Sequence, residues 1–451
     1  NKSLLANTTA SNNTAVGDST LTANTTGTAN TAVGAWALGA TTTASVNTGI
    51  GYYALKVNTT GASNTAVGGG ALVANTTGSQ NNALGHKALE KNTTGSDNVA
   101  VGYDALGENL VGVNNIAIGH SALTLNTASY NTAVGKSALA ANTTGAYGTG
   151  IGQGALTANT TGDYNTAVGR NALAANTTAD NNTSVGTNSM DANSTGADNT
   201  ALGKNALGAN TTASNNTAVG SVALQANTTG TVNTAVGKNA LGANTTGAYN
   251  TAVGALAGDA ITTGPYNTAF GYLALSTETA GQESVAIGSQ ALATQNTSGG
   301  GAIYNTAVGT SAGRLVTTGT NNTFIGGLSG DAVTTGASNT FVGQASGSST
   351  TTGAQNVAVG EGALFTNTTA SNNTAIGRDA MYRNTTGANN TVLGHSAGKE
   401  VTTGANNTAV GGSALKANTT GATNTAMGAN ALDANTTGSE NTALGYNSLT
   451  A

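Results

Sequence analysis

Few side chains in this chain could carry out chemistry, and those that could are scattered. Each of the three histidines directly follows a glycine, at a corner-like position whose residue type varies along the chain: His86, His120 and His395. No serine and carboxylate can be assigned to them as a catalytic triad, and no His-Glu-x-x-His zinc motif occurs. The Gly-Lys-Ser tripeptide at 135–137 matches only the end of a phosphate-binding loop, because Tyr130 occupies the position of that loop's first glycine.

Carboxylates and thiols offer no better catalytic centre. The chain has no cysteine, only 7% of its residues are charged, and the calcium-binding motif Gly-Gly-x-Gly-x-Asp is missing. The acidic residues are dispersed, so no pair stands out as the acid and base of a glycoside hydrolase. We therefore predict a protein that is not an enzyme, with no catalytic residues, no bound metal and no cofactor.

Two recurring groups of residues could instead contact or carry sugars. Asn-Thr-Thr triplets match the N-glycosylation acceptor motif many times, and the candidates include Asn7, Asn24, Asn58, Asn75 and Asn142. Tyrosines form two spaced rows, Tyr130, Tyr147 and Tyr164 followed by Tyr249 and Tyr266. A row of aromatic rings could stack on a glycan or could simply stiffen the surface. Both rows share one 17-residue spacing, which points to the architecture that must position them.

The 17-residue spacing runs through the whole chain. Segments of the type Asn-Thr-Ala-Val-Gly recur 26 times from Gly17 to Gly445, and 23 of the 25 steps between them have this length. The exceptions are a shorter, 16-residue step from Gly119 to Gly135 and a longer, 21-residue step from Gly288 to Gly309. We number the repeat 1 to 17 with this glycine at place 5. The repeat then reads N-T-A-V-G-x-x-A-L-x-A-N-T-T-G-x-x.

A repeat of this length predicts an all-β fold, a parallel β-solenoid with one turn per repeat and about 26 turns. Places 1–5 and 8–12 have the length of strands, and glycines at places 5 and 15 suit sharp corners. We expect a single continuous repeat domain over residues 1–451. Both ends fall inside a repeat without a polar cap, so the chain reads as an excerpt of a longer fibre whose anchor and tip lie elsewhere. The two irregular steps are expected to be local excursions at a corner, near 296–303 and 126–130, that keep the strands stacked.

Comparison of the copies predicts which places share the core. Place 9 is Leu or Met in 21 copies and Gly in five, and those five copies replace the usual Asn at place 12 by Ile261, Val316, Val333, Thr350 or Val401. The only large residues at place 3 also fall in Gly copies: Phe324, Phe341 and Val392. Because protein interiors are close-packed, places 3, 9 and 12 are expected to border one cavity.

Strand alternation then turns places 2 and 4 away from that cavity. Place 4 is apolar in every copy, so an apolar ladder would lie on the outer face and would call for a partner, most simply another copy of the chain. The alternative puts place 4 inside and the alanine of place 3 outside. Place 1 is Asn in 24 of 26 copies, which predicts a hydrogen-bonded asparagine ladder. The exchange between places 9 and 12 indicates that the acceptor Asn of place 12 is partly buried.

Residues 284–288, Ser-Val-Ala-Ile-Gly, resemble the signature of YadA-like heads of trimeric autotransporter adhesins, and 98–102 and 115–119 are close variants. The resemblance covers nearly the whole chain. It implies a left-handed parallel β-roll with three chains side by side, displayed outside the cell to bind host matrix. The repeat here is longer than in those heads, with an added Asn-Thr-Thr-Gly corner. Long Asn-Thr-Ala-Val-Gly arrays are also similar to the shafts of phage tail-fibre and related surface fibre proteins.

These observations lead to one expected function and two alternatives. We expect an extracellular structural and adhesive fibre segment on a cell surface or virion, a homotrimer whose partners are further copies of itself and carbohydrate or extracellular matrix. A net charge of −5 does not favour nucleic acid, and no apolar run approaches the roughly 20 residues of a membrane span. The first alternative is an ice-binding solenoid, which needs two outward columns of Thr from places 13 and 14. The second is a polysaccharide-processing β-helix enzyme.

Overall fold

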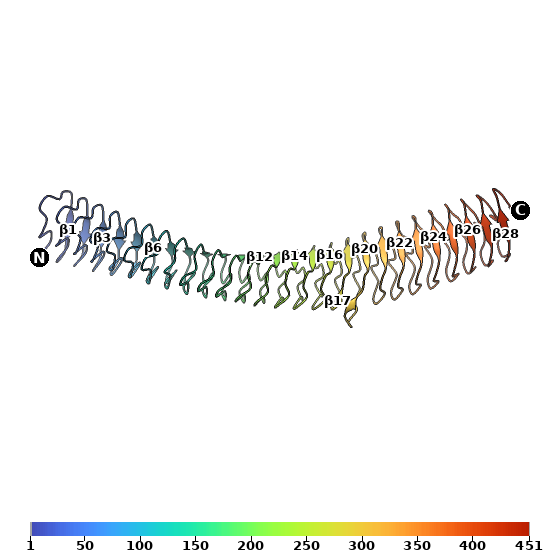
Figure 1. The fold of residues 1–451 in the computed structure, drawn as a ribbon, viewed down its shortest axis with the longest axis horizontal. Coiled ribbons are helices and arrows are strands. Elements are labelled where there is room, and N and C mark those ends of the chain that lie inside the picture. The colour runs from blue at the N-terminus through green and yellow to red at the C-terminus, as the bar shows by residue number, and fades with distance from the viewer. Residues whose placement is uncertain (1, 451) are drawn as a thin grey trace. The chain divides into compact units, whose positions relative to one another are not determined.

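The computed structural model describes residues 2–450, which form two compact units, one ending at Val222 and one beginning at Ala223. Each unit is a parallel β-solenoid in which one turn corresponds to one 17-residue repeat, and no helix occurs among the described residues (Figure 1). The predicted fold class is therefore confirmed. That residues 1–451 form one continuous domain, and that the coil is left-handed, both stay predictions.

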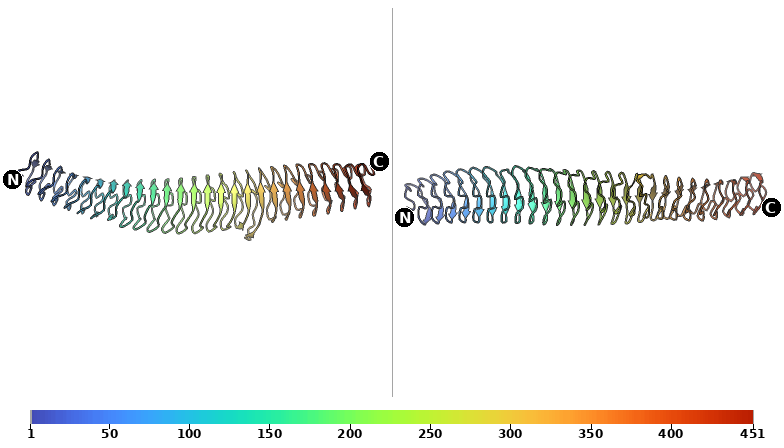
Figure 2. Two further views of the ribbon diagram at one scale, coloured as in Figure 1. Left: turned by 45° about the horizontal axis from the view of Figure 1, so that its top comes forward. Right: turned by 90° about the horizontal axis from the view of Figure 1, so that it is seen from below.

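Each turn of the first unit contributes one strand to a parallel sheet in which equivalent places pair, as in Thr31 with Thr48. The strands lie along one side of the coil (Figure 2). They are β1 (Thr14–Val16), β2 (Thr31–Val33), β3 (Thr48–Ile50), β4 (Thr65–Val67), β5 (Asn82–Leu84), β6 (Val99–Val101), β7 (Ile116–Ile118), β8 (Thr132–Val134), β9 (Thr149–Ile151), β10 (Thr166–Val168), β11 (Thr183–Val185), β12 (Thr200–Leu202) and β13 (Thr217–Val219).

The second unit repeats this arrangement and adds one short strand pair. Its main sheet contains β14 (Thr234–Val236), β15 (Thr251–Val253), β16 (Thr268–Phe270), β18 (Val285–Ile287), β20 (Thr306–Val308), β21 (Thr323–Ile325), β22 (Thr340–Val342), β23 (Val357–Val359), β24 (Thr374–Ile376), β25 (Thr391–Leu393), β26 (Thr408–Val410), β27 (Thr425–Met427) and β28 (Thr442–Leu444). The pair consists of β17 (Gly281–Gln282) and β19 (Gly301–Ala302).

The strand of each turn covers places 2–4, inside the predicted segment at places 1–5. The prediction of a second strand at places 8–12 is wrong. Places 6–11 form consecutive turns with positive φ at places 7 and 9, as at Tyr53 (63°) and Leu55 (52°), whereas a parallel strand needs φ near −120°. The turns still stack by hydrogen bonds, because the Leu55 amide donates to the Ala71 carbonyl of the next turn at 3.0 Å.

A leucine with positive φ at place 9 is the unexpected feature of this backbone. The left-handed conformation costs a residue with a side chain about 1–2 kcal/mol, and complete burial of a leucine contributes about 1.5–3 kcal/mol. Leu38, with φ of 52°, has no exposed surface. Burial therefore offsets the backbone cost in the inner leucine turns, but not at Leu449 of the last described turn, which has φ of 53° and is 57% exposed. Glycine removes the cost in the other five turns, but it leaves the core to be filled by other residues.

The filling residues are those predicted from the comparison of the copies. A Cβ on Gly258 would lie 3.0 Å from Ile261 Cδ1, and one on Gly330 would lie 2.5 Å from the Phe324 ring. The place 12 substitutes and the large place 3 residues are all at most 1% exposed: Ile261, Val316, Val333, Thr350, Val401, Phe324, Phe341 and Val392. The prediction that places 3, 9 and 12 border one cavity is confirmed.

Two asparagine ladders run beside the core that places 3, 9 and 12 form. At place 1, the Asn64 Oδ1 accepts a hydrogen bond from the Asn81 backbone amide of the next turn at 2.9 Å. At place 12, the Asn75 Nδ2 donates to the Asn58 Oδ1 of the previous turn at 2.8 Å. Both ladders meet at the carbonyl of place 15, because the Gly78 oxygen accepts from Asn64 Nδ2 and Asn75 Nδ2 at 2.8 and 2.9 Å. The predicted place 1 ladder is confirmed, and the second ladder is an addition to it.

The two irregular steps leave the strand stacking intact, as predicted. β7 pairs with β8 across the 16-residue step, with Ile116 opposite Thr132, and β18 pairs with β20 across the 21-residue step. The extra residues of the longer step leave the coil at its corner, where β19 pairs with β17 in a projection (Figure 1). Ile303, only 1% exposed, brings the chain back into the core.

Candidate functional surface

The outer face of the strands, formed by the side chains of places 2 and 4, recurs in the turns of each unit. Places 2 and 4 carry no charged residue in any copy, and the place 4 side chains lie outside the coil. Leu84 is 52% exposed in the first unit, and Phe270 and Met427 are 53% and 42% exposed in the second. The place 3 alanines between them are buried, as Ala83 is at 1%. The predicted orientation is confirmed, and the alternative with place 4 inside is wrong.

The tyrosine rows lie on the surface at place 17, each within one unit. The rings of Tyr130, Tyr147 and Tyr164 are about half exposed and stack face to face, with centroids 5.1 and 5.0 Å apart and planes within 2°. Tyr249 and Tyr266 stack in the same way, 5.0 Å apart. A sugar between two rings would need roughly 7 Å, twice the ~3.5 Å contact distance. The rows therefore present ring edges and hydroxyl groups, and the space between neighbouring rings is too narrow for a sugar.

The candidate glycosylation asparagines lie inside the coil. Asn24, Asn58, Asn75 and Asn142 all belong to the place 12 ladder and have no exposed surface. The Asn142 Nδ2, for example, donates to the Asn126 Oδ1 at 2.7 Å and to the Gly145 carbonyl at 2.8 Å. Both amide protons are used, so a sugar could be attached only to an amide that had left the ladder. Glycosylation stays a prediction, and the folded coil is a poor acceptor.

The threonines at places 13 and 14 do not form two outward columns. At place 13, the Thr76 hydroxyl donates to the Thr93 carbonyl of the next turn at 3.0 Å, and the residue is half-buried. At place 14, Thr77 is exposed. Alternation thus leaves one of the two columns facing the solvent, as expected.

The histidines are exposed, at the same corner of three turns. His86 and His120 flank Tyr103 with ring centroids 5.7 and 5.1 Å away, and His120 shares a 3.0 Å hydrogen bond with the Ser121 hydroxyl. Within residues 2–450, no group of three or more histidines and carboxylates lies close enough to hold a metal ion. His395 of the second unit is likewise at the surface.

Glu278 is the one fully buried acidic residue among those described, and it replaces the place 12 asparagine just before the longer step. Its Oε1 accepts hydrogen bonds from the backbone amides of Thr279 and Gly281 at 2.9 and 2.7 Å. Its Oε2 accepts from Gln295 Nε2 at 3.2 Å, and the same amide donates to the Ser284 hydroxyl at 2.9 Å. A carboxylate surrounded by donors substitutes for the amide ladder and is unsuited to binding a cation.

Asp259 lies at place 10 of a turn in the second unit, and the burial of its carboxyl makes the stability of the chain depend on pH. Burial raises the pKa of the Asp259 carboxyl, and a weak 3.5 Å hydrogen bond from Asn239 Nδ2 opposes that rise. Because the folded pKa exceeds the unfolded value near 3.9, folding favours the protonated form. Stability is therefore gained as pH falls through the folded pKa, and the carboxylate lowers stability at neutral pH.

We expect Asp259→Asn to raise the urea midpoint of the full chain at pH 7 and to reduce its change between neutral pH and about pH 4. Amide hydrogen exchange in the turn around Asp259 should slow at pH 7. The exposed Glu361→Gln is the matched control and should leave both measurements unchanged. An unchanged midpoint at pH 7 in Asp259→Asn would show that burial costs this carboxylate nothing.

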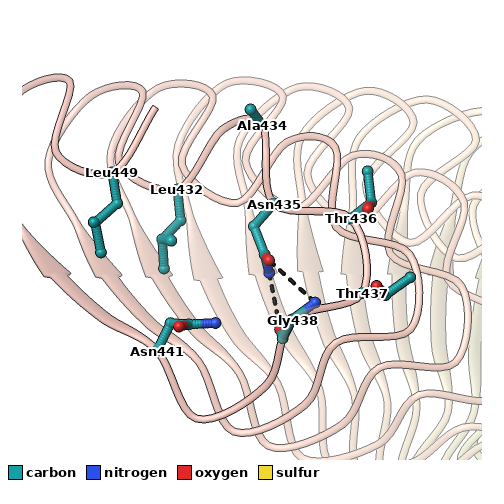
Figure 3. Close-up of a pocket in the computed structure, with 8 residues that line it drawn as sticks. All are labelled: Leu432, Ala434, Asn435, Thr436, Thr437, Gly438, Asn441 and Leu449. Atoms are coloured by element: carbon teal, nitrogen blue, oxygen red, sulfur yellow. Dashed lines mark hydrogen bonds between the residues drawn. The ribbon is translucent and has the colours of Figure 1, made fainter. Parts of the chain in front are cut away.

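Two cavities stand out on the described part of the chain. One, of about 370 Å³, is the interior of the last described turn, between Leu432, Asn435, Asn441 and Leu449 (Figure 3). These four residues occupy places 9, 12 and 1, which form the core in the other turns as well. The Asn435 Nδ2 donates to the Gly438 carbonyl at 2.9 Å, as the asparagines of the place 12 ladder do. The cavity is therefore part of the repeat and forms no separate site.

The other cavity, of about 400 Å³, lies at the surface of the first unit beside Trp36 and Lys56. Sequence reasoning missed it, although two signals were present. Trp36 is the only tryptophan in the chain, and a lysine follows it three places further along the repeat in the next turn.

None of the described residues forms a helix long and apolar enough to cross a membrane. No protein-family model matches the chain, and no curated protein sequence is significantly similar to it.

Proposed function

We propose that the chain is a non-enzymatic, extracellular structural and adhesive fibre segment that assembles with copies of itself as a homotrimer. Assembly takes place through the strand face, by which we mean the outer surface formed by the side chains of places 2 and 4. The coil then acts as a rigid repetitive spacer, and the surfaces outside the strand face contact carbohydrate or extracellular matrix. The observation that supports this proposal best is the uncharged, partly exposed apolar ladder at place 4, present in the turns of both units.

The physical argument rests on the repetition of this ladder. Burial of apolar surface contributes about 25 cal/mol per Å², and a stripe that recurs in every turn offers much more area than an isolated exposed residue. The best-matched partner has the same spacing between turns, because each of its side chains can then meet an equivalent one. Another copy of the chain meets that requirement without further adjustment.

Assembly is tested by placing charges on this face. We expect the double variant Val253→Asp, Phe270→Asp to lose the oligomer, because paired residues of β15 and β16 would carry unpaired charges into a dehydrated interface. The measurement is the molar mass of the full chain by light scattering at micromolar concentration. The control is Ala255→Asp, Tyr272→Asp, at exposed corners two residues further along in the same turns and with the same change in charge. A monomeric wild-type chain, or equal masses for the two double variants, would contradict the proposal.

An ice-binding surface is the second candidate. The threonines at place 2 also lie on the strand face and repeat in register, as Thr149 opposite Thr166 does, which is the regular hydroxyl array that such a function needs. The columns at places 13 and 14, on which the sequence argument for ice binding depended, do not both face outward. Thermal hysteresis of a monomeric wild-type chain would favour this function over self-assembly.

A further inference from the structure

The cavity beside Trp36 is built from three consecutive turns of the first unit, on the side formed by places 6–11. Thr22, Gly39 and Lys56 occupy place 10 of these turns, and Trp36 reaches the same spot from place 7. None of these residues lies on the strand face, so the cavity stays open if that face is covered in an assembly.

Gly39 produces the hollow. It carries no side chain between the threonine and the lysine of the neighbouring turns, so the surface dips at the middle turn. A Cβ on Gly39 would lie 3.6 Å from Trp36 Cε3, and 3.3 and 3.5 Å from the carbonyl oxygens of Trp36 and Ser19. The indole therefore forms one wall, and the Trp36 carbonyl beside Gly39 already accepts a hydrogen bond from the Gly39 amide at 3.2 Å.

Trp36 is an unusual residue for its place in the repeat. It is 43% exposed and has φ of 61° at place 7, where most copies carry Asn, Asp, Ser or Gly. The other turns adopt the same left-handed φ at place 7, as at Tyr53 and Leu256, so the backbone conformation does not distinguish Trp36 from them. Core packing does not explain the tryptophan, because much of its surface faces the solvent.

Lys56 supplies the only charged group of the cavity. Its Nζ lies 5.8 Å from the Trp36 ring centroid and 4.2 Å from that of Tyr53, and the residue is half-buried. Among the described residues, Lys56 has no ion pair with a carboxylate. A ligand with a carboxylate could therefore pair with this ammonium without displacing a protein carboxylate.

We propose that this cavity binds one acidic sugar residue, a hexuronate, with its apolar face on the Trp36 indole and its carboxylate at the Lys56 ammonium. A cavity of about 400 Å³ falls within the usual range of roughly 300–1,000 Å³ for small-ligand sites. The walls are only half-buried, so the ligand keeps one side in water. A pyranose fits this arrangement, because its apolar face can lie on the mainly apolar lining while its hydroxyl groups face the water. A nucleotide would need more cations than one lysine.

This inference rests on the proposed adhesive function and names the class of glycan that the fibre would contact. A single half-open site gives weak binding to one sugar, and assembled copies would raise the affinity for an acidic polysaccharide through multivalency. The site lies away from the strand face, so binding and assembly can be measured separately.

The experiment uses the fluorescence of Trp36 itself as the signal, because Trp36 is the only tryptophan of the chain. Selective excitation of its fluorescence during titration with glucuronate should give a saturable change. Glucose should bind at least about tenfold more weakly, because it lacks the carboxylate. Lys56→Met should weaken glucuronate binding about tenfold or more and leave glucose unaffected. Gly39→Leu should abolish binding of both sugars by filling the hollow.

The control is Lys399→Met, which removes a lysine 5.6 Å from another aromatic ring, Tyr382, in the second unit and should leave the titration unchanged. Circular dichroism establishes that each variant is folded. Equal affinities for glucose and glucuronate, or wild-type affinity in Lys56→Met, would overturn the inference. Light scattering of the same samples separates the two proposals, because a failed titration with an intact oligomer contradicts the acidic sugar alone. A saturable titration of a monomer contradicts only the assembly.

Discussion

Gly411→Ala is expected to open the coil locally, whereas the same change at the next residue, Gly412, should have almost no effect. Gly411 occupies place 5 with φ of 133°, and a Cβ there would lie 2.6 Å from the carbonyl carbon and oxygen of Gly428 in the next turn. Backbone atoms cannot rotate away as a flexible side chain can. The turn must therefore shift, and the stacking hydrogen bonds on both sides shift with it.

The expected cost combines two effects. Overpacking costs about 1–3 kcal/mol, and the left-handed φ adds about 1 kcal/mol for a residue with a side chain. Because the stability of a repeat coil is roughly a sum over neighbouring turns, the damage should concentrate near the substitution. Amide hydrogen exchange of the full chain should accelerate by tenfold or more from about Gly394 to Gly428 and stay unchanged in distant turns.

Gly412→Ala is a stringent control, because a Cβ at this place 6 glycine would meet nothing within 4 Å. The two variants have the same composition and differ by one position. Equal exchange in both would mean that the close approach of successive place 5 glycines does not constrain the coil.

Asn109→Asp is expected to be the most damaging exchange of one polar side chain for another of the same size. The Asn109 Nδ2 donates to the Asn92 Oδ1 at 2.9 Å and to the Gly112 carbonyl at 3.0 Å, and the residue has no exposed surface. A carboxylate in its place would direct an oxygen at two other oxygens in the core. An unpaired buried charge costs several kcal/mol or forces its own protonation.

The matched control is Asn114→Asp, five residues later in the same turn, where the asparagine is exposed at place 17. Both variants add one negative charge, and the second should cost less than about 0.5 kcal/mol. Hydrogen exchange over residues 92–131 at pH 7 distinguishes them. The Asn109→Asp defect should partly recover at low pH, where the buried carboxyl can bind a proton. Normal protection in Asn109→Asp at pH 7 would show that the ladder amides are replaceable.

The sequence by itself determined the period, the position of the irregular steps and the orientation of the strand. These features could be predicted because the repeats of a single chain can be compared with one another, place by place. When place 9 loses its leucine, place 12 or place 3 gains volume, as in the turns of Gly258 and Gly330, and close packing converts that exchange into proximity. Strand alternation then fixed the outward direction of place 4.

The tertiary structure alone decided the conformation of places 6–11 and the use of the surface groups. Leucine does not favour a positive φ, so nothing local at Leu38 or Leu55 signals one. Burial and stacking against neighbouring turns offset that cost. The tyrosine rows show the same limit, because equal spacing along the sequence could not reveal that the rings cover one another's faces.

The cavity beside Trp36 depends most completely on the fold. Trp36, Gly39 and Lys56 occupy different places of successive repeats, so no motif links them in the sequence. They meet because residues of successive turns lie one above the other once the coil has formed, and because a missing side chain at Gly39 leaves room that the indole only partly fills. Composition and period determine a coil, whereas the packing of unlike residues between neighbouring turns determines where its regular surface is interrupted.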